Sequence, residues 1–111
     1  MKISKETQEK IQELQLLEQN LQNLILQKQA FQMELNEVEN ALTEVEKTKD
    51  EIYKIVGQVM LKADKQETEK ELKEKKDILN LRIKSIEKQE SLFKDKTDKI
   101  REQVTKEIKS D

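Results

Sequence analysis

The fold is decided by a stretch near the middle of the chain, residues 52–63, which reads IYKIVGQVMLKA. β-Branched and aromatic residues dominate it, and Gly57 is the only glycine in the chain. Such residues favour strands, and a glycine permits the tight turn of a hairpin. The sequence therefore predicts a β-hairpin over residues 52–64, with a three-residue loop at 56–58.

That loop length determines which side chains share a face, because successive strand residues alternate between the two faces of a sheet. A three-residue loop places on one face Tyr53, Ile55, Val59, Leu61 and Ala63. It places on the other face Lys54, Met60 and Lys62.

Before the hairpin, an apolar stripe recurs at alternating steps of three and four residues. Its members are Leu14, Leu17, Leu21, Leu24, Lys28, Phe31, Leu35, Val38, Leu42, Val45, Lys49 and Ile52. An average step of 3.5 residues is the period of a coiled coil, which buries such a stripe in a seam against a partner helix. It predicts a helix over residues 4–50.

After the hairpin, a weaker stripe follows the same period. Its members are Leu72, Lys76, Leu79, Ile83, Ile86, Glu90, Phe93, Thr97, Ile100, Val104 and Glu107. It predicts a second helix over residues 67–109. At about 1.5 Å per residue the helices would measure roughly 70 and 64 Å.

The predicted fold class is therefore mostly α, with residues 1–111 in one unit. Two long helices of similar length form an antiparallel coiled coil, and one short β-hairpin joins them. The polar seam residues Lys28, Lys49, Lys76 and Glu90 are expected to set the register of the coil or to extend past the seam. Phe31 and Phe93 are expected to pack in it.

The composition argues against catalysis and bound cofactors. Charged residues make up 41% of the chain, hydrophobic residues 33%, and His and Cys are absent. Nucleophilic dyads and the usual zinc spacings are therefore missing, and one glycine cannot form a phosphate-binding loop. We expect no catalytic residue, no cofactor and no metal.

Charge and hydropathy also argue against nucleic acid and membrane partners. The net charge of -2 comes from intermixed acids and bases, whereas nucleic-acid binding needs a basic face. The apolar runs are far shorter than the roughly 20 residues that span a bilayer, and mixed charge without Trp is unlike a membrane-surface helix. No signal peptide is visible, and we expect a cytoplasmic protein.

The predicted hairpin needs other chains to cover it, because a two-stranded hairpin alone in water is marginal and has open edges. We expect it to serve subunit assembly by pairing with other hairpins. The other interpretation is a β-kinked connector between the helices.

The chain resembles the beta-type subunits of prefoldin along nearly its whole length. The resemblance rests on YKIVGQVML at residues 53–61 and LRIKSIEKQE at residues 81–90. It is similar to the archaeal-like class with a single hairpin, whereas alpha-type subunits carry two. The hairpin residues expected to assemble are Tyr53, Ile55, Val56, Gly57, Val59, Met60 and Leu61.

The resemblance implies a function. Prefoldin is an ATP-independent chaperone, a hexamer of two alpha-type and four beta-type subunits whose hairpins form a β-barrel platform. It holds unfolded client proteins between its coiled coils and passes them to a folding chaperonin. For this chain, the resemblance implies a group II chaperonin as the partner.

The coil end that carries both termini is the expected client-binding site, and we call it the tip. Thr7, Lys10 and Glu107 make the seam polar there, which predicts fraying. The apolar residues expected to bind clients are Ile3, Ile11, Leu14, Leu16, Ile100, Val104 and Ile108. The alternative function is a structural spacer, tether or homodimerisation module that binds no client.

Overall fold

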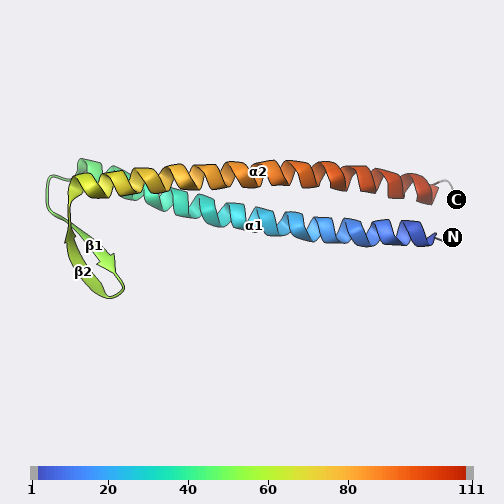
Figure 1. Ribbon diagram of the computed structural model, residues 1–111, viewed down its shortest axis with the longest axis horizontal. Coiled ribbons are helices and arrows are strands. Elements are labelled where there is room, and N and C mark those ends of the chain that lie inside the picture. The colour runs from blue at the N-terminus through green and yellow to red at the C-terminus, as the bar shows by residue number, and fades with distance from the viewer. Residues whose placement is uncertain (1–2, 110–111) are drawn as a thin grey trace. The chain divides into compact units, whose positions relative to one another are not determined.

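The computed structural model describes residues 3–109 as two helices joined by a β-hairpin (Figure 1). Helix α1 spans Lys5–Lys47, strand β1 Ile52–Val56, strand β2 Val59–Ala63 and helix α2 Lys65–Lys109. The predicted fold class, two long helices with a single antiparallel hairpin, is confirmed.

The chain divides into two units, each containing a part of both helices. Among the described residues, unit 1 comprises 3–29 and 84–109, and unit 2 comprises 30–83 with the whole hairpin. The cross-helix contacts include Lys10–Glu107 and Lys28–Glu90 in unit 1, and Phe31–Arg82 and Glu34–Lys75 in unit 2. Within each unit, α1 residues with higher residue numbers contact α2 residues with lower residue numbers, so the two helices are antiparallel.

The predicted stripes form the seams of both units. Every stripe member from Leu14 to Val45 and from Leu72 to Glu107 is buried or half-buried. The apolar side chains that are most buried are Leu17, Leu24, Ile86 and Val104 in unit 1, and Val38, Leu42, Leu79 and Ile83 in unit 2. The periodicity thus locates the core correctly.

The first stripe ends earlier than predicted, because α1 stops at Lys47. Thr48 bonds locally instead, and its hydroxyl accepts the backbone N–H of Asp50 at 3.3 Å. Such side-chain bonds compete with helix continuation. Placing Lys49 and Ile52 on the seam was therefore wrong: Lys49 is exposed outside the helix, and Ile52 begins β1.

Both helices begin at a capping residue. The Ser4 hydroxyl accepts the Thr7 N–H at 3.1 Å, and the Asp64 carboxylate accepts the Glu67 N–H at 3.0 Å. Each cap satisfies a backbone donor that has no partner within the helix. Because Asp64 caps so close to β2, α2 begins at Lys65 instead of the predicted residue 67.

The hairpin turn contains two residues, Gly57 and Gln58, and not three. β1 and β2 pair antiparallel, with Ile52 opposite Ala63 and Val56 opposite Val59. Gly57 has a φ of 62°, and Gln58 does not have a positive φ. This pattern is that of a type II′ turn, whose twist matches that of the flanking strands.

The shorter turn corrects the predicted faces, because residues directly opposite each other share a face. One face carries Ile52, Lys54, Val56, Val59, Leu61 and Ala63. The other carries Tyr53, Ile55, Met60 and Lys62. Grouping Tyr53 and Ile55 with Val59, Leu61 and Ala63 was wrong, as was grouping Lys54 with Met60, and both faces are largely apolar.

Leu79 should be among the most sensitive core positions, since its side chain is only 1% exposed. We expect Leu79→Ala to lower the free energy of unfolding by about 2–4 kcal/mol through lost burial and a residual cavity. Denaturant unfolding followed by far-UV circular dichroism measures it. Leu81→Ala is the matched control on the same helix, because Leu81 is 66% exposed. Equal losses in both variants would contradict this assignment of the core.

Candidate functional surfaces

The hairpin presents an exposed apolar surface on both faces. Six of its apolar residues are between 51% and 70% exposed: Tyr53, Ile55, Val56, Val59, Met60 and Leu61. The sheet that it forms has two strands, so each strand also has an open edge. The predicted assembly residues therefore lie together, and Gly57 forms the turn between them.

The base of the hairpin is held by polar contacts across its strands. Glu51 Oε1 lies 2.9 Å from Lys62 Nζ, and the Tyr53 hydroxyl donates to Glu51 Oε2 at 3.0 Å. The hydrogen bond from Lys62, and then that from Tyr53, hold the pKa of the Glu51 carboxyl below its usual value, with desolvation opposing them. The hairpin also contacts α2, because Lys54 Nζ lies 3.2 Å from Glu71 Oε2.

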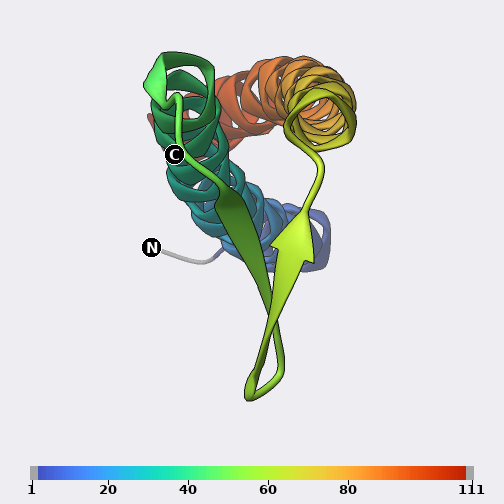
Figure 2. The ribbon, with the colours of Figure 1, turned by 90° about the vertical axis from the view of Figure 1, so that its left-hand side faces the viewer.

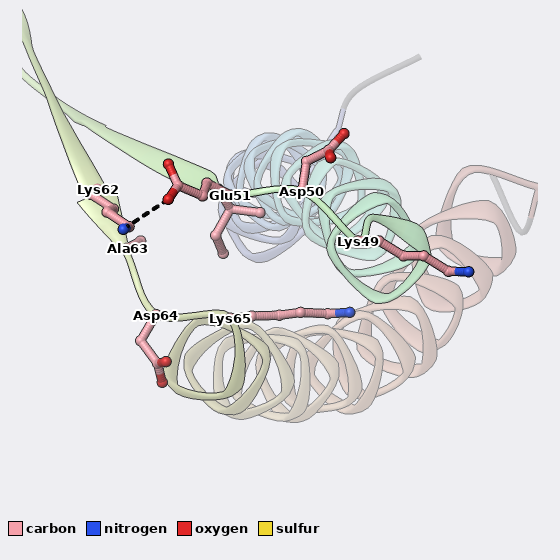
Figure 3. Close-up of a pocket in the computed structure, with 8 residues that line it drawn as sticks. Lys49, Asp50, Glu51, Lys62, Ala63, Asp64 and Lys65 are labelled. Atoms are coloured by element: carbon pink, nitrogen blue, oxygen red, sulfur yellow. Dashed lines mark ion pairs between the residues drawn. The ribbon is translucent and has the colours of Figure 1, made fainter.

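A shallow hollow lies between the two segments that connect the hairpin to the helices (Figure 3). Its lining alternates in charge, with Lys49, Lys62 and Lys65 beside Asp50, Glu51 and Asp64. Such a lining selects neither an anion nor a cation. Over residues 3–109 no acidic cluster has the arrangement of a metal site.

The predicted client-binding residues lie in unit 1 with very different exposure. Ile3 and Leu16 are exposed, at 40% and 58%. Ile11, Leu14, Ile100 and Ile108 are half-buried, and Val104 is buried in the seam. Of these seven residues, only Ile3 and Leu16 are thus exposed without movement of the helices.

In the described residues, the polar side chains at the tip bond across the seam in a polar clasp, which the sequence did not predict. The clasp consists of Ser4, Thr7, Lys10 and Glu107. Thr7 is buried and donates a hydrogen bond to Glu107, whose other oxygen lies 2.6 Å from Lys10 Nζ. The Ser4 and Thr7 hydroxyls are 2.8 Å apart. Polar residues at a seam can therefore bond across it.

The clasp shifts the pKa values of its two charged members in opposite directions. The hydrogen bond from Lys10, followed by that from Thr7, lowers the pKa of Glu107, against the effect of desolvation. The hydrogen bond to Glu107 raises the pKa of Lys10, again against desolvation. Each group therefore favours its charged form in the folded chain.

The seam of unit 1 contains further polar side chains. Lys28 Nζ lies 3.3 Å from Glu90 Oε1 and 3.7 Å from Glu87 Oε2. The Thr97 hydroxyl is buried without a hydrogen-bond partner in the described part of the chain. The buried polar residues of this part, Thr7, Glu90 and Thr97, all belong to unit 1. The seam of unit 1 therefore buries polar side chains beside its apolar ones, whereas the buried residues described in unit 2 are apolar.

Sequence reasoning missed several exposed apolar residues on the helices, namely Leu26, Met33, Ile78, Leu81 and Leu92. For Leu26, the sequence around it contained a signal that could have indicated its exposure. The exposed residues between Glu18 and Lys28 are uncharged, with Gln and Asn dominating, in a chain that is 41% charged. We call the exposed residues Gln19, Gln22, Asn23, Leu26 and Gln27 the amide face of α1.

Neither helix, over residues 3–109, contains a stretch that is both long and apolar enough to cross a membrane.

Comparison with known proteins gives a consistent family. The family model described as "Prefoldin subunit" matches residues 8–111. The prefoldin subunit beta of Pyrobaculum islandicum is 41% identical over 90 residues, which cover 79% of this chain and 72% of the relative. That of Methanospirillum hungatei is 35% identical over 108 residues, covering 96% and 90%.

A solved structure matches as well. The crystal structure of the prefoldin beta subunit from Thermococcus strain KS-1 aligns with a TM-score of 0.87 at 33% identity. The alignment covers 95% of this chain and 94% of that one.

The clasp predicts a pH dependence of stability. Because the folded pKa of Glu107 lies below its ordinary value of 4.5, its contribution is present above 4.5 and is lost as the pH falls through the folded pKa. The contribution of Lys10 is present below 10.5 and is lost as the pH rises through its raised pKa. Glu107→Gln should lower the melting temperature at neutral pH, and this difference from wild type should shrink in acid.

Thermal melts at a series of pH values measure this difference. Glu102→Gln is the matched control, since Glu102 is an exposed carboxylate 3.9 Å from Lys106 on the same helix. A difference between wild type and Glu107→Gln that stays constant from neutral pH to below 4.5 would contradict the role of the clasp.

Proposed function

Because this chain belongs to the prefoldin subunit family, we propose that it acts as a beta-type subunit of an ATP-independent holdase. Prefoldin is a chaperone family, and membership implies assembly with other prefoldin subunits. In the proposal, the hairpin assembles the subunits and the tip holds unfolded polypeptides. The chain takes part in no catalysis.

The single observation that carries the proposal is the hairpin, which is apolar on both faces and open at both edges. Water-exposed apolar patches of this kind mark sites of association. Closing several hairpins into a barrel satisfies the open edges and gives one face an apolar interior. We propose that four such chains join two alpha-type chains in a hexamer with a β-barrel platform.

A barrel interior buries only one face of the hairpin, so the exposed second face needs a separate contact. Burying one face inside a barrel leaves the other face of the hairpin outside it. Ile55 and Met60, at 70% and 64% exposed, lie on the face opposite to that of Val56, Val59 and Leu61. Complete burial thus requires contacts on both faces, which a mere connector between two helices would not require.

Client binding at the tip is supported by exposed apolar side chains next to a weak part of the seam. Ile3 and Leu16 are exposed, while Leu14, Ile100 and Val104 line a seam that also contains the buried Thr97, whose hydroxyl has no hydrogen-bond partner among the described residues. A seam that buries an unsatisfied hydroxyl opens locally at a lower free-energy cost than an apolar one. Opening would add the seam residues to the surface that meets a client.

The amide face of α1 extends this surface along the same helix. Gln and Asn side chains offer both a donor and an acceptor, so they can bond to the backbone of any polypeptide. Without charges, the face does not discriminate between acidic and basic clients. Weak contacts of this kind become useful when several subunits present them together.

The spacer or homodimerisation alternative has less support, because it gives no reason for exposed apolar residues at both the hairpin and the tip. Transfer of clients to a group II chaperonin completes the proposed mechanism. The cytoplasmic location stays a prediction from the sequence.

Native mass spectrometry of the 13.2 kDa chain, purified with its cellular partners, tests the assembly. We expect four copies of this chain together with two copies of a longer coiled-coil chain.

Ile55→Ser with Met60→Ser should abolish the hexamer while leaving helical circular dichroism unchanged, because both residues are exposed in the single chain. The control pair is Met33→Ser with Leu81→Ser, which replaces exposed residues outside the hairpin. If native mass spectrometry of the wild-type chain shows a homodimer as the largest species, the proposed hexamer is wrong.

Suppression of client aggregation tests the tip. We expect Ile3→Ser with Leu16→Ser, in an intact hexamer, to raise the concentration needed for half-suppression on the order of tenfold, because the loss repeats at several tips. Light scattering of an aggregating client measures it. Leu92→Ser is the matched control, since Leu92 is 63% exposed in unit 1 but has Lys88 and Lys96 one helical turn away. Suppression equal to wild type by the double variant would mean that clients bind elsewhere.

A further inference from the structure

The two connections between the hairpin and the helices differ in length. Only Asp64 separates β2 from α2, whereas residues 48–51 separate α1 from β1. The single residue on the α2 side is also fixed by its capping bond to the Glu67 N–H. The four-residue connection between α1 and β1 would let the hairpin change direction relative to α1 unless another contact restrained it.

Lys65 ties the first residue of this connection, Thr48, to α2. Its side chain extends from the first turn of α2 toward the end of α1 (Figure 3), and Nζ donates to the Thr48 carbonyl oxygen at 2.9 Å. The Glu46 carbonyl oxygen lies 3.5 Å from the same nitrogen. The last carbonyls of a helix have no partner within it and carry the negative end of its dipole, so a lysine ammonium is a favourable partner there.

A second contact restrains the hairpin from its other side. Lys54, in the centre of β1, lies 3.2 Å from Glu71 in the second turn of α2. Both side chains are more than half exposed, so the pair contributes little to stability by itself. It does set which face of the hairpin lies toward α2, namely the face that carries Val56, Val59 and Leu61.

The hairpin projects from the ends of the two helices in unit 2, and its body lies clear of them (Figure 2). Most of its side chains are exposed, with Ile52 and Ala63 half-buried at its base. Apolar packing against the chain's own helices therefore cannot fix its direction. Polar contacts at the base are the available restraint.

We propose that Lys65, assisted by the Lys54–Glu71 ion pair, is a positioning residue that fixes the direction of the hairpin before subunits assemble. A hairpin held in its bound direction loses less conformational freedom on assembly, which raises affinity without a new intersubunit contact. This inference rests on the proposed assembly through the hairpin. The direction of the hairpin in the isolated chain can nevertheless be measured independently.

The chain contains no cysteine, so two introduced cysteines give unambiguous spin labels. We place them by Gln58→Cys in the turn and Glu74→Cys on α2, both within unit 2. In the isolated full-length chain, Lys65→Met should broaden the distribution of label distances, whereas Lys65→Arg should keep it narrow. Lys70→Met is the matched control for a lost charge on an exposed part of α2.

Assembly is then measured with unlabelled chains, by titrating each variant against the other prefoldin subunits. We expect Lys65→Met to need about tenfold more protein for half-assembly, the factor that corresponds to one lost charge-assisted hydrogen bond, and Lys65→Arg to restore it. Circular dichroism should show equal helix content in all variants. The effect would then arise from the direction of the hairpin and not from unfolding.

Two results would overturn the proposal. A distance distribution in Lys65→Met as narrow as that of wild type would show that Lys65 does not fix the hairpin. A broadened distribution with unchanged assembly would show that its direction does not matter for association. If instead the wild-type chain fails to assemble while its distances respond to Lys65, the proposed assembly is wrong and the restraint itself stands.

Discussion

Burial of a single narrow stripe from each helix is the interaction on which the rest of this structure depends. Residues such as Leu24, Val38 and Leu79 meet along the seams, and most of the remaining helix surface is polar. A two-helix coil has only one layer of core, so its apolar burial is used up by the seam itself. None remains to cover the hairpin. The seams therefore bury the apolar stripes of the helices, while the apolar side chains of the hairpin stay exposed.

The quality of the seam differs between the two units, and this difference is relevant to function. In unit 2 the most buried residues are apolar, Lys65 joins the start of α2 to the end of α1, and the Glu51–Lys62 pair holds the hairpin base. In unit 1 the seam contains Thr7, Glu90 and Thr97. In the proposed function, the unit whose described buried residues are apolar is the one that assembles, and the unit that also buries polar residues is the one that meets clients.

The sequence predicted the elements that depend on periodicity. The stripes from Leu14 to Val45 and from Leu72 to Glu107 identified the seam, because an apolar residue every 3.5 positions has one stable solution in a helix pair. The end of α1 was less predictable, since Lys49 and Ile52 continue the period although Thr48 and Asp50 bond locally outside the helix.

Two other features depend on geometry that composition does not contain. Val56 suits a strand and a loop alike, so the alternation of residues could not distinguish a two-residue from a three-residue turn. Thr7 and Glu107 were interpreted as a source of fraying, yet they bond across the seam because the antiparallel register brings them together. The exposure of Leu16 and the burial of Val104 likewise follow from their places around the helix.

The two-residue turn at Gly57 and Gln58 also constrains how this protein can change in length. With no slack in the turn, inserting or deleting one residue in either strand would move every later side chain of that strand to the opposite face. Lys62 would exchange places with Leu61 or Ala63, and a charge would enter the face that carries Val56 and Val59. Length changes in the hairpin should thus be tolerated in pairs of residues or together with a compensating bulge. In the helices a single insertion displaces the seam by part of a turn, so the two kinds of element impose different rules on insertions and deletions.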